Sequence, residues 1–309
     1  MAKTIFVFPG QGAQYVGMGK SLSESFAPAK ILLEKADDVL GFSLSKIMFE
    51  GPEEVLKSTD NTQPALFVSS MMVLEALRFE GIDFDMVAGH SLGEYSAICA
   101  AGGFSFEDGL RLVRVRGSLM ASAGEKNPGS MAAIIGVDDD KVHALCEEVA
   151  SVGVVVPANY NCPGQIVVSG SVDGVKKLVE NCASLGVRAV PLAVSGAFHS
   201  PLMQFAQAGL AEAIAKTKFK DLDKPLLANV TAQPVTSGKD IADLLVRQLV
   251  SPVRWNQLMT YAVKEAHITH GVEVGVGRVL GGLMRKIDRS VKFASVESLE
   301  SIQALKGTL

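Results

Sequence analysis

The chain has 309 residues, of which 48% are apolar, 20% charged and 6% aromatic. A chain this apolar can bury enough surface to offset its ordering entropy, which excludes intrinsic disorder, and its length predicts one large domain or two smaller ones. With 29 basic and 33 acidic side chains, the net charge is −4. This balance is not that of a dedicated nucleic-acid-binding protein, so we expect no nucleic-acid partner.

The cysteines and the apolar stretches indicate the compartment. The four cysteines lie far apart and form no C-x-x-C pair: Cys99, Cys146, Cys162 and Cys182. This spacing predicts neither a disulfide scaffold nor a metal site, and it favours a reducing compartment. The amino terminus lacks the apolar core of a signal peptide, and the two uncharged stretches, 149–172 and 189–211, contain proline and glutamine. We therefore expect a soluble, cytoplasmic protein without a membrane segment.

The first 127 residues alternate strand and helix patterns. The expected elements are a strand at Thr4–Phe8 with a glycine loop at 9–12, helices at 29–40 and 63–79, a strand at 86–88, and helices at 92–101 and from Ser105 to about Ala123. Strands that alternate with helices predict a mostly parallel sheet covered on both faces.

The pattern changes after Gly124. Strands are expected at 130–137, 154–159, 165–169 and 188–192, with helices at 138–150 and 172–185. This β-α-β-β-α-β order is the ferredoxin-like split unit, so we predict a small domain at 128–194 inserted into a larger α/β domain made of 1–127 and 195–309. Later elements are a helix from about Pro201, a strand near 226–230, helices at 241–249 and 256–266, and a strand at 271–274; the helix Val279–Ile287 is expected to close the chain.

A G-x-S-x-G motif stands at Gly89-His-Ser-Leu-Gly93, between an expected strand and an expected helix. This is the context that a nucleophile elbow requires, in which the glycines allow a sharp turn that exposes the Ser91 hydroxyl. The amide of Leu92, at the start of the helix, can then face a developing oxyanion. The alternative is that Ser91 only caps the helix.

A serine nucleophile needs a base, and the chain offers five histidines: His90, His143, His199, His267 and His270. His143 falls in a polar helix and is expected to face solvent, and His267 and His270 flank the start of a strand. His199 lies in a loop just before a helix, where catalytic groups concentrate, and is the best candidate base. The alternative for His199 is a hydrogen-bonded core histidine.

Arg116 falls in the middle of the apolar face of its expected helix, formed by Leu112, Val113, Val115, Leu119 and Met120. Arg111 and Arg114 project away from that face. An arginine among apolar neighbours is costly unless an anion pairs with it. The anion is either a carboxylate of the protein or a ligand carboxylate held by the guanidinium fork.

The loop Pro9-Gly-Gln-Gly12 contains neither G-x-G-x-x-G nor G-x-x-x-x-G-K-[ST], so nucleotide binding is not indicated. The backbone amide of Gln11 could instead supply a second oxyanion donor beside that of Leu92.

Taken together, these segments resemble the malonyl-CoA:acyl carrier protein transacylases, the stand-alone acyltransferases of bacterial-type fatty-acid synthesis. The matching segments are FPGQGAQ (8–14), TQPA (62–65), GHSLGEYS (89–96), RG (116–117), MAAI (131–134), NCPGQ (161–165), GAFHS (196–200) and VRQL (246–249). The departures from the family pattern are Ala13, Cys162 and Val276, none of which is an expected catalytic group.

The resemblance implies a role for each matching residue. Ser91 would be the acyl-accepting nucleophile, His199 its base, and Arg116 the group that binds the free malonyl carboxylate. The amides of Gln11 and Leu92 would form the oxyanion hole, and the backbone carbonyl of Gln248 would orient the histidine in place of an aspartate. The Phe198 side chain would crowd an α-methyl branch and so favour malonyl over methylmalonyl groups.

The resemblance also implies the fold, the substrates and the reaction. The fold would be α/β, a hydrolase-like mostly parallel sheet core with an inserted ferredoxin-like domain. The substrate would be malonyl-CoA, the acceptor acyl carrier protein, and the reaction would need no metal or redox cofactor. Two alternatives stay open: a trans-acting acyltransferase of a polyketide synthase, and a serine thioesterase or hydrolase.

A basic stretch lies near the carboxyl terminus: Arg278, Arg285, Lys286, Arg289 and Lys292. Since acyl carrier proteins are acidic, this stretch is a candidate docking surface. The alternative is an ordinary solvated helix face.

Overall fold

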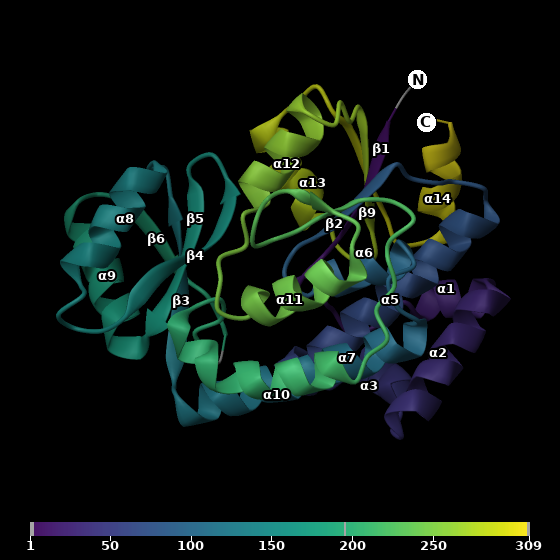
Figure 1. The fold of residues 1–309 in the computed structure, drawn as a ribbon, viewed down its shortest axis with the longest axis horizontal. Helices are drawn as coiled ribbons and strands as arrows, with labels where there is room; N and C mark the ends of the chain where they lie inside the picture. Colours follow the sequence, from purple (N-terminus) through teal and green to yellow (C-terminus); the bar gives the residue numbers. More distant parts are fainter. Residues whose placement is uncertain (1–2, 195, 308–309) are drawn as a thin grey trace.

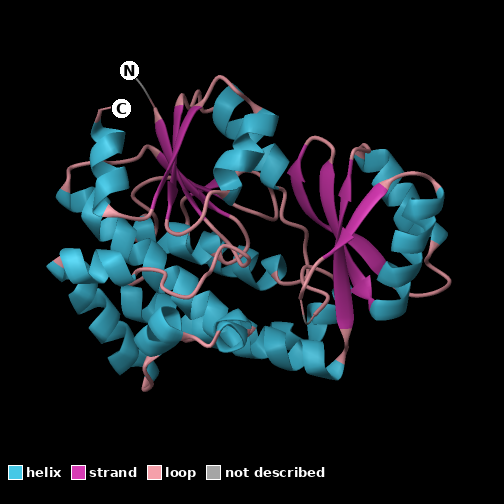
Figure 2. Cartoon of the chain, turned by 180° about the vertical axis from the view of Figure 1, so that it is seen from behind, coloured by secondary structure: helices cyan, strands magenta, loops and turns pink. Residues whose placement is uncertain are grey.

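The computed structural model describes residues 3–194 and 196–307. It contains two separate β-sheets, each with its own helices (Figures 1 and 2). A six-stranded, mostly parallel sheet lies in the larger part of the molecule, and a four-stranded antiparallel sheet lies beside it. The expected α/β class is confirmed.

The strands of the first sheet are β1 (Thr4–Phe8), β2 (Met86–Gly89), β7 (Leu226–Leu227), β8 (Pro234–Val235), β9 (His270–Val274) and β10 (Lys292–Val296). They are arranged in the order β10-β9-β1-β2-β7-β8. Neighbouring strands are parallel, except that β7 and β8 are antiparallel. β1 and β2 are central, so both are buried on both faces, which explains their continuous apolar sequences.

The helices of the larger part are α1 (Lys20–Ser25), α2 (Ala27–Leu40), α3 (Leu44–Glu50), α4 (Glu53–Lys57), α5 (Thr59–Phe79), α6 (Gly93–Ala100), α7 (Phe106–Lys126), the 3₁₀ turn η1 (Pro201–Met203), α10 (Gln204–Ala215), α11 (Gly238–Gln248), α12 (Trp255–Lys264), α13 (Val279–Ile287) and α14 (Leu299–Lys306). Side chains alternate along β1, so Phe6 and Phe8 pack into the core that contains α5 and α7, while Ile5 and Val7 pack against α12 and α13. The sheet is therefore covered on both faces.

The second sheet comprises β3 (Gly129–Ile135), β4 (Val155–Cys162), β5 (Gln165–Ser171) and β6 (Arg188–Pro191), in the order β4-β5-β3-β6. The helices α8 (Asp139–Glu148) and α9 (Val172–Ser184) cover one face of this sheet (Figure 2). β3 and β4 are both antiparallel to β5, which lies between them, so they run parallel to each other with α8 as their connection. All four strands and both helices match the expected elements in order.

Backbone hydrogen bonds attach the second sheet to the larger part of the molecule between α11 and α12. The amide of Tyr160 donates to the carbonyl of Val253 at 2.9 Å, and the amide of Val253 donates to the carbonyl of Ala158 at 2.8 Å. The edge strand β4 is thereby attached to the loop before α12. This attachment places the residues after β6 and those after α11 close to the carboxyl end of β2.

Several expectations about the elements are wrong. The helix Val279–Ile287 does not close the chain, because β10 and α14 follow it. The strand expected at 226–230 is limited to Leu226–Leu227, since the amide of Asn229 donates to the Glu94 carboxylate at 2.8 Å instead of to a neighbouring strand. The short helices α1, α3 and α4 and the short strand β8 were not expected from the sequence.

Among the described residues, no helix is both long enough and apolar enough to cross a membrane.

Candidate active site

Ser91 lies in a sharp turn between β2 and α6 and has a φ of 52°, in the left-handed region. The two glycines of the motif permit this turn. A Cβ on Gly93 would lie 2.0 Å from the carbonyl oxygen of Phe8, and a Cβ on Gly89 would lie 1.9 Å from the backbone of Gly93. Helix α6 therefore starts in direct contact with β1, and a strained non-glycine residue is held at the turn, as expected of a nucleophile elbow.

The turn brings Ser91 and His199 together although they are 108 positions apart in the sequence. Ser91 Oγ lies 2.7 Å from His199 Nε2. His199 Nδ1 lies 3.0 Å from the carbonyl oxygen of Gln248 and 3.1 Å from that of Ser251. Two carbonyl acceptors require a proton on Nδ1, so Nε2 carries the lone pair that accepts the Ser91 hydroxyl proton. The contact with Ser251 had no signal in the sequence.

His199 is buried and lies near a cation, which keeps its imidazole neutral. Burial and, to a smaller extent, the Arg116 charge together lower the pKa of His199 to about 3, against the opposing effect of the Gln248 and Ser251 carbonyls. A neutral imidazole at Nε2 can act as a general base. His199 lies in the loop between β6 and η1, and its backbone has a φ of 57°, in the left-handed region.

Arg116 is 1% exposed and points from α7 at Ser91. Its Nη2 donates to Ser91 Oγ at 3.1 Å and to Gln248 Oε1 at 2.9 Å, and its Nη1 donates to Gln63 Oε1 at 2.8 Å. Within residues 3–194 and 196–307 its guanidinium forms no ion pair. The described contacts therefore do not support the alternative in which a carboxylate of the protein pairs with Arg116. The apolar face expected around Arg116 is incomplete, because Val115 is 36% exposed.

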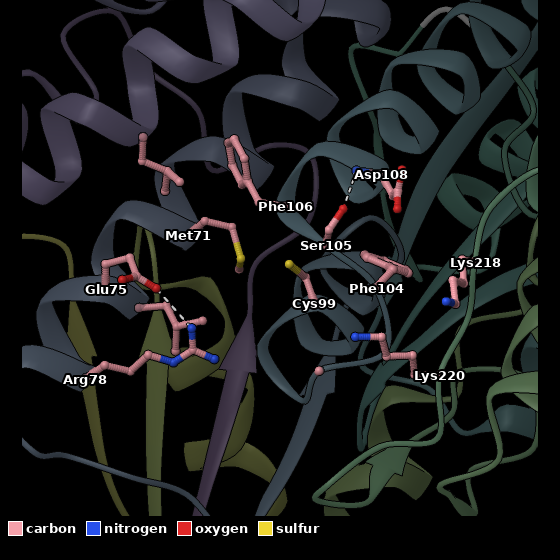
Figure 3. Close-up of a pocket in the computed structure, with 13 residues that line it drawn as sticks. Met71, Glu75, Arg78, Cys99, Phe104, Ser105, Phe106, Asp108, Lys218 and Lys220 are labelled. Carbon is pink, nitrogen blue, oxygen red and sulfur yellow. Dashed lines mark hydrogen bonds and ion pairs between the residues drawn. The ribbon is translucent and has the colours of Figure 1, made fainter.

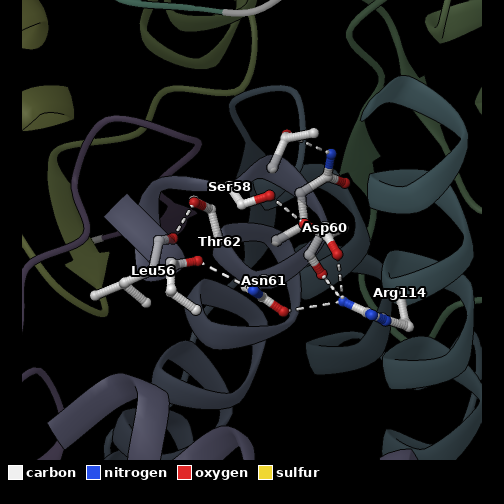
Figure 4. A network of polar contacts seen from close by, with 9 residues as sticks. Leu56, Ser58, Asp60, Asn61, Thr62 and Arg114 are labelled. Carbon is white, nitrogen blue, oxygen red and sulfur yellow. Dashed lines mark hydrogen bonds and ion pairs between the residues drawn. The ribbon is translucent and has the colours of Figure 1, made fainter. Parts of the chain in front are cut away.

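A second arginine on α7 fixes that helix against the start of α5 (Figure 4). Arg114 Nη1 donates to the Asp60 carbonyl at 2.5 Å, to Asp60 Oδ2 at 3.1 Å and to Asn61 Oδ1 at 3.0 Å. The helices approach so closely there that a Cβ on Gly117 would lie 2.8 Å from the backbone of Thr59 and Asp60. Arg116 lies between Arg114 and Gly117 on α7, and Gln63 lies about one turn after Asp60 on α5. The packing of the two helices therefore brings Gln63 and Arg116 into contact.

The two expected oxyanion donors both line the cavity beside Ser91. Leu92 is the residue before the first turn of α6, and Gln11 lies in the loop after β1, where its side chain accepts a hydrogen bond from Thr59 Oγ1 at 2.6 Å. Neither backbone N–H donates to another group in the described part of the chain. A Cβ on Gly10 would lie 2.5 Å from the His90 carbonyl oxygen, so the Gln11 loop packs directly on the elbow.

Three further polar side chains support the elbow from beneath. Asn229 Oδ1 accepts from the Ser91 amide at 2.9 Å, and Asn229 Nδ2 donates to the Gly89 carbonyl at 2.7 Å. Gln248 Nε2 donates to the Ser91 carbonyl at 2.9 Å and also to the Glu94 carboxylate. Asn229 and Glu94 had not been identified from the sequence, because neither stands in a short motif that names a role for it.

The cavity at Ser91 has a volume of about 420 Å³ and lies between the two sheets. Its wall combines the polar groups above with apolar side chains from both parts of the molecule: Leu92, Met120, Met131, Leu192, Val194 and Phe198. Phe198 is 6% exposed and stands directly before the base. Lys57 and Gln14 also line the cavity.

A second cavity, of about 540 Å³, lies against α5 and α7 (Figure 3). Its wall includes Cys99, whose thiol pKa burial raises to about 12, so this thiol is not a reactive nucleophile. Its other polar side chains include Glu75 and Arg78, which pair with each other at 3.0 Å. No histidine is among the described residues that line this cavity.

Three of the other histidines, His90, His143 and His270, have partners of their own. His90 Nε2 lies 2.9 Å from Asn161 Oδ1, and its ring packs on Trp255, with 5.5 Å between centroids. His143 is exposed, as expected, and its Nε2 lies 3.0 Å from the Tyr160 hydroxyl. His270 is buried in β9. In the described part of the chain, no cluster of histidine, cysteine and acidic side chains has the arrangement of a metal site.

Comparisons with known proteins confirm the resemblance read from the motifs. The family described as "Acyl transferase domain" matches residues 5–300. The chain is 44% identical to the malonyl CoA-acyl carrier protein transacylase of Bacillus subtilis (strain 168), over all of this chain and 98% of that protein. It is likewise 44% identical to the protein of that name from Staphylococcus aureus (strain MRSA252), over 98% of both chains.

Solved structures agree with the sequence relatives. The acyl-carrier-protein S-malonyltransferase of Bartonella henselae superposes with a TM-score of 0.95 at 42% identity, over 99% of both chains. A malonyl-transacylase solved in complex with the acyl carrier protein of a type II polyketide synthase superposes with a TM-score of 0.96 at 37% identity, over the full length of both. The chain therefore belongs to the acyl transferase family and, within it, to the malonyl CoA-acyl carrier protein transacylases.

Proposed function

We propose that this chain transfers the malonyl group of malonyl-CoA to the phosphopantetheine thiol of acyl carrier protein through an ester on Ser91, and that it does so in the cytoplasm to supply fatty-acid elongation. Its membership of the transacylase family supports this activity. The observation that carries the choice of acyl group is the 3.1 Å hydrogen bond between Arg116 Nη2 and Ser91 Oγ. A buried guanidinium that touches the nucleophile favours an acyl group with a free carboxylate.

In the first half-reaction, Ser91 Oγ attacks the thioester carbonyl carbon while His199 Nε2 takes the hydroxyl proton. The new Oγ–C bond leaves the carbonyl oxygen with a negative charge, which the amides of Gln11 and Leu92 stabilise. The intermediate collapses when the C–S bond breaks, and the imidazolium returns its proton to the departing sulfur of CoA. Arg116 holds the distal carboxylate throughout, so the acyl carbon stays near the nucleophile.

The second half-reaction reverses these steps with a different thiol. The phosphopantetheine thiol of the carrier protein gives its proton to His199 Nε2 and attacks the ester carbon of the malonylated serine. The C–Oγ bond then breaks, and the serine oxygen recovers a proton from the imidazolium. This double displacement is a ping-pong cycle in which the enzyme is restored after each transfer.

The substrate carboxylate also assists the base. The Arg116 charge lowers the pKa of His199, which favours the neutral imidazole before reaction but opposes the imidazolium that proton transfer creates. A malonyl carboxylate bound to Arg116 offsets that charge. Malonyl binding therefore makes His199 a stronger base, which an acetyl group cannot do.

The test is the intact mass of the protein after brief mixing with malonyl-CoA, with acetyl-CoA and the Ser91→Ala variant as controls. A malonyl-sized adduct that requires Ser91 and disappears when acyl carrier protein is added supports the cycle. Free malonate accumulating without an adduct would contradict it, because water would then be the acceptor, as in a serine hydrolase.

A second candidate acceptor is the carrier protein of a polyketide synthase. The solved relative in complex with a type II polyketide carrier gives this alternative its support. Rates of transfer to fatty-acid and polyketide carrier proteins, measured side by side, separate the two pathways.

We further propose the domain organisation expected from the sequence: a ferredoxin-like small domain at 128–194 inserted into a hydrolase-like core made of 1–127 and 195–309. β5 lies between β3 and β4, which α8 connects; this split β-α-β arrangement supports the ferredoxin-like domain. The elbow at the end of the central strand β2 supports the hydrolase-like core.

A further inference from the structure

One buried acidic side chain takes no part in the steps above. Glu94 is 2% exposed and lies on α6, three positions after Ser91. Its Oε1 accepts from the backbone amide of Asn229 at 2.8 Å, and its Oε2 accepts from Gln248 Nε2. It forms no ion pair within the described residues, so a carboxylate is placed in the interior with two neutral N–H donors as its partners.

Both partners of Glu94 hold the backbone of the nucleophile. Asn229 contacts the Ser91 amide and the Gly89 carbonyl through its side chain, and Gln248 Nε2 contacts the Ser91 carbonyl. The turn at Ser91 has a left-handed φ, a conformation that persists only where its surroundings hold it in place. Glu94 joins the backbone of Asn229 to the side chain of Gln248, and these two residues hold the turn.

The carboxylate also fixes the orientation of the Gln248 amide. Because Glu94 accepts from Nε2, the Oε1 of Gln248 faces the other way and accepts from Arg116 Nη2 at 2.9 Å. The same residue orients His199 through its backbone carbonyl. A neutral amide thus lies between a buried anion and a buried cation, and its dipole is aligned with both charges.

We infer that Glu94 is a positioning residue for the acyl transfer: its ionised carboxylate orients Asn229 and Gln248, which in turn hold Ser91, and Arg116 through Gln248, in reactive geometry. This inference rests on the proposed function. Glu94 touches no reacting atom, so it acts only through these two neighbours.

The protonation state of Glu94 decides whether it can serve this purpose. Both partners are donors, so the ionised carboxylate offers each of them a charged acceptor, whereas protonation turns one of its oxygens into a donor. Burial raises the pKa of Glu94 to about 7, against the lowering effects of the Asn229 and Gln248 donors and of the Arg116 charge on α7. The neighbouring Tyr95 is neutral, since burial raises its pKa to about 12. Acylation should therefore decline as the pH falls through the pKa of Glu94.

The experiment measures the rate of Ser91 acylation by malonyl-CoA and by acetyl-CoA as a function of pH, in the wild type and in Glu94→Gln. The variant keeps the side-chain shape but replaces one acceptor with a donor, so a partner amide must turn away. We expect the maximal rate to fall by about 10- to 100-fold for both acyl groups, as for a small misplacement of reacting atoms, and the acid-side decline to disappear.

The matched control is Glu273→Gln. Glu273 is also a buried glutamate whose raised pKa is due to burial, and it accepts from the amides of Leu280 and Gly281 and from Ser295 Oγ, none of which touches Ser91. Both variants are expected to lower the melting temperature. Only Glu94→Gln should lower the acylation rate per folded molecule and change its pH profile.

Glu94→Asp provides the second variant if Glu94→Gln does not fold. This variant keeps the negative charge, but its shorter side chain moves the carboxylate oxygens away from Asn229 and Gln248. We therefore expect an intermediate acylation rate, with the decline at low pH retained. An unchanged rate in Glu94→Gln, an equal loss in Glu273→Gln, or a wild-type rate in Glu94→Asp would each overturn the inference while leaving the proposed function intact. Failure of the wild type itself to form the malonyl adduct would overturn the proposed function and this inference with it.

Discussion

Arg116 Nη2 and His199 Nε2 both lie on Ser91 Oγ, at 3.1 and 2.7 Å, so the guanidinium and the base contact the same oxygen atom. The hydroxyl accepts from the arginine and donates to the histidine. A substrate carboxylate that binds the guanidinium must therefore enter beside the nucleophile. In the proposed mechanism, acyl-group selection and activation of Ser91 are therefore coupled through this one oxygen atom.

Arg116→Ala should separate malonyl from acetyl transfer. Charge-assisted hydrogen bonds contribute about 1.5–3 kcal/mol each, so we expect malonylation of Ser91 to slow by about 100-fold, while acetylation is unchanged or faster. The measurement is the rate of adduct formation with each acyl-CoA. Arg111→Ala is the control, because Arg111 is exposed on the same helix and pairs with Asp108 at 3.4 Å. An equal loss for both acyl groups would mean that Arg116 only supports the elbow.

The buried imidazole of His199 should make the folded protein sensitive to acid. Its pKa is lowered from 6.5 to about 3 by burial and by Arg116, whereas in the unfolded chain it takes up a proton as the pH falls through 6.5. The unfolded state then binds more protons in this window, so the free energy of unfolding decreases as the pH is lowered from 6.5 towards 3.

His199→Gln should reduce this dependence. The melting temperature, followed over the same pH range, is expected to fall less steeply in His199→Gln than in the wild type. Glu94 has a raised pKa and contributes a slope of the opposite sign, but it is present in both proteins and cancels in the comparison. His143→Gln, at an exposed position, should match the wild type. Parallel curves for the wild type and His199→Gln would refute the assignment.

The parts of this molecule that were predictable from the sequence are those where a local pattern has one structural solution. Thr4–Phe8 and the strand at β2 are continuous apolar sequences, and the glycines that flank Ser91 are required by contacts of 2.0 Å or less at a Cβ. Arg116 was identifiable because a charged residue interrupted an apolar helix face. Each of these signals lies within a short stretch of the sequence.

The features that were missed depend on contacts between distant segments. Glu94 follows the elbow as one more polar residue in α6, and its importance comes from Asn229 and Gln248, which are 135 and 154 positions away. β10 and α14 are short, and β10 is an edge strand with a mixed sequence. Ser251 contacts His199 through its backbone carbonyl, which any residue type could provide.

Phe198 should contribute to the choice between malonyl and methylmalonyl groups. It lines the cavity and is nearly buried, so a smaller side chain creates room for an α-methyl branch. One methyl group is worth about 1–3 kcal/mol of discrimination, so Phe198→Leu should raise the methylmalonyl-to-malonyl acylation ratio by about tenfold or more. Competition between the two acyl-CoA substrates, read by adduct mass, measures that ratio. Met131→Leu, elsewhere on the cavity wall, is the control for a general loosening; an equal change in both variants would exclude a specific role for Phe198.

The basic residues on and beside α13 should matter for the carrier protein and not for malonyl-CoA. Arg278, Arg285, Lys286, Arg289 and Lys292 are all exposed, although Lys286 also donates to Gln165 on β5 at 3.4 Å. The double variant Arg285→Glu/Arg289→Glu therefore tests docking and leaves the contact between Lys286 and Gln165 in place. We expect the apparent KM for acyl carrier protein to rise by about tenfold or more, with a weaker effect at high salt, because such pairs are screened.

Self-acylation by malonyl-CoA is the internal control for this double variant, since the first half-reaction needs no carrier protein. Charge reversal at Lys30 and Lys46, on α2 and α3, is the matched surface control. An unchanged KM in the α13 variant would leave this stretch as a solvated helix face and would place the docking surface elsewhere. A loss in the self-acylation rate would instead mean that the substitutions disturb the fold around the active site, because an exposed charge has no direct contact with Ser91.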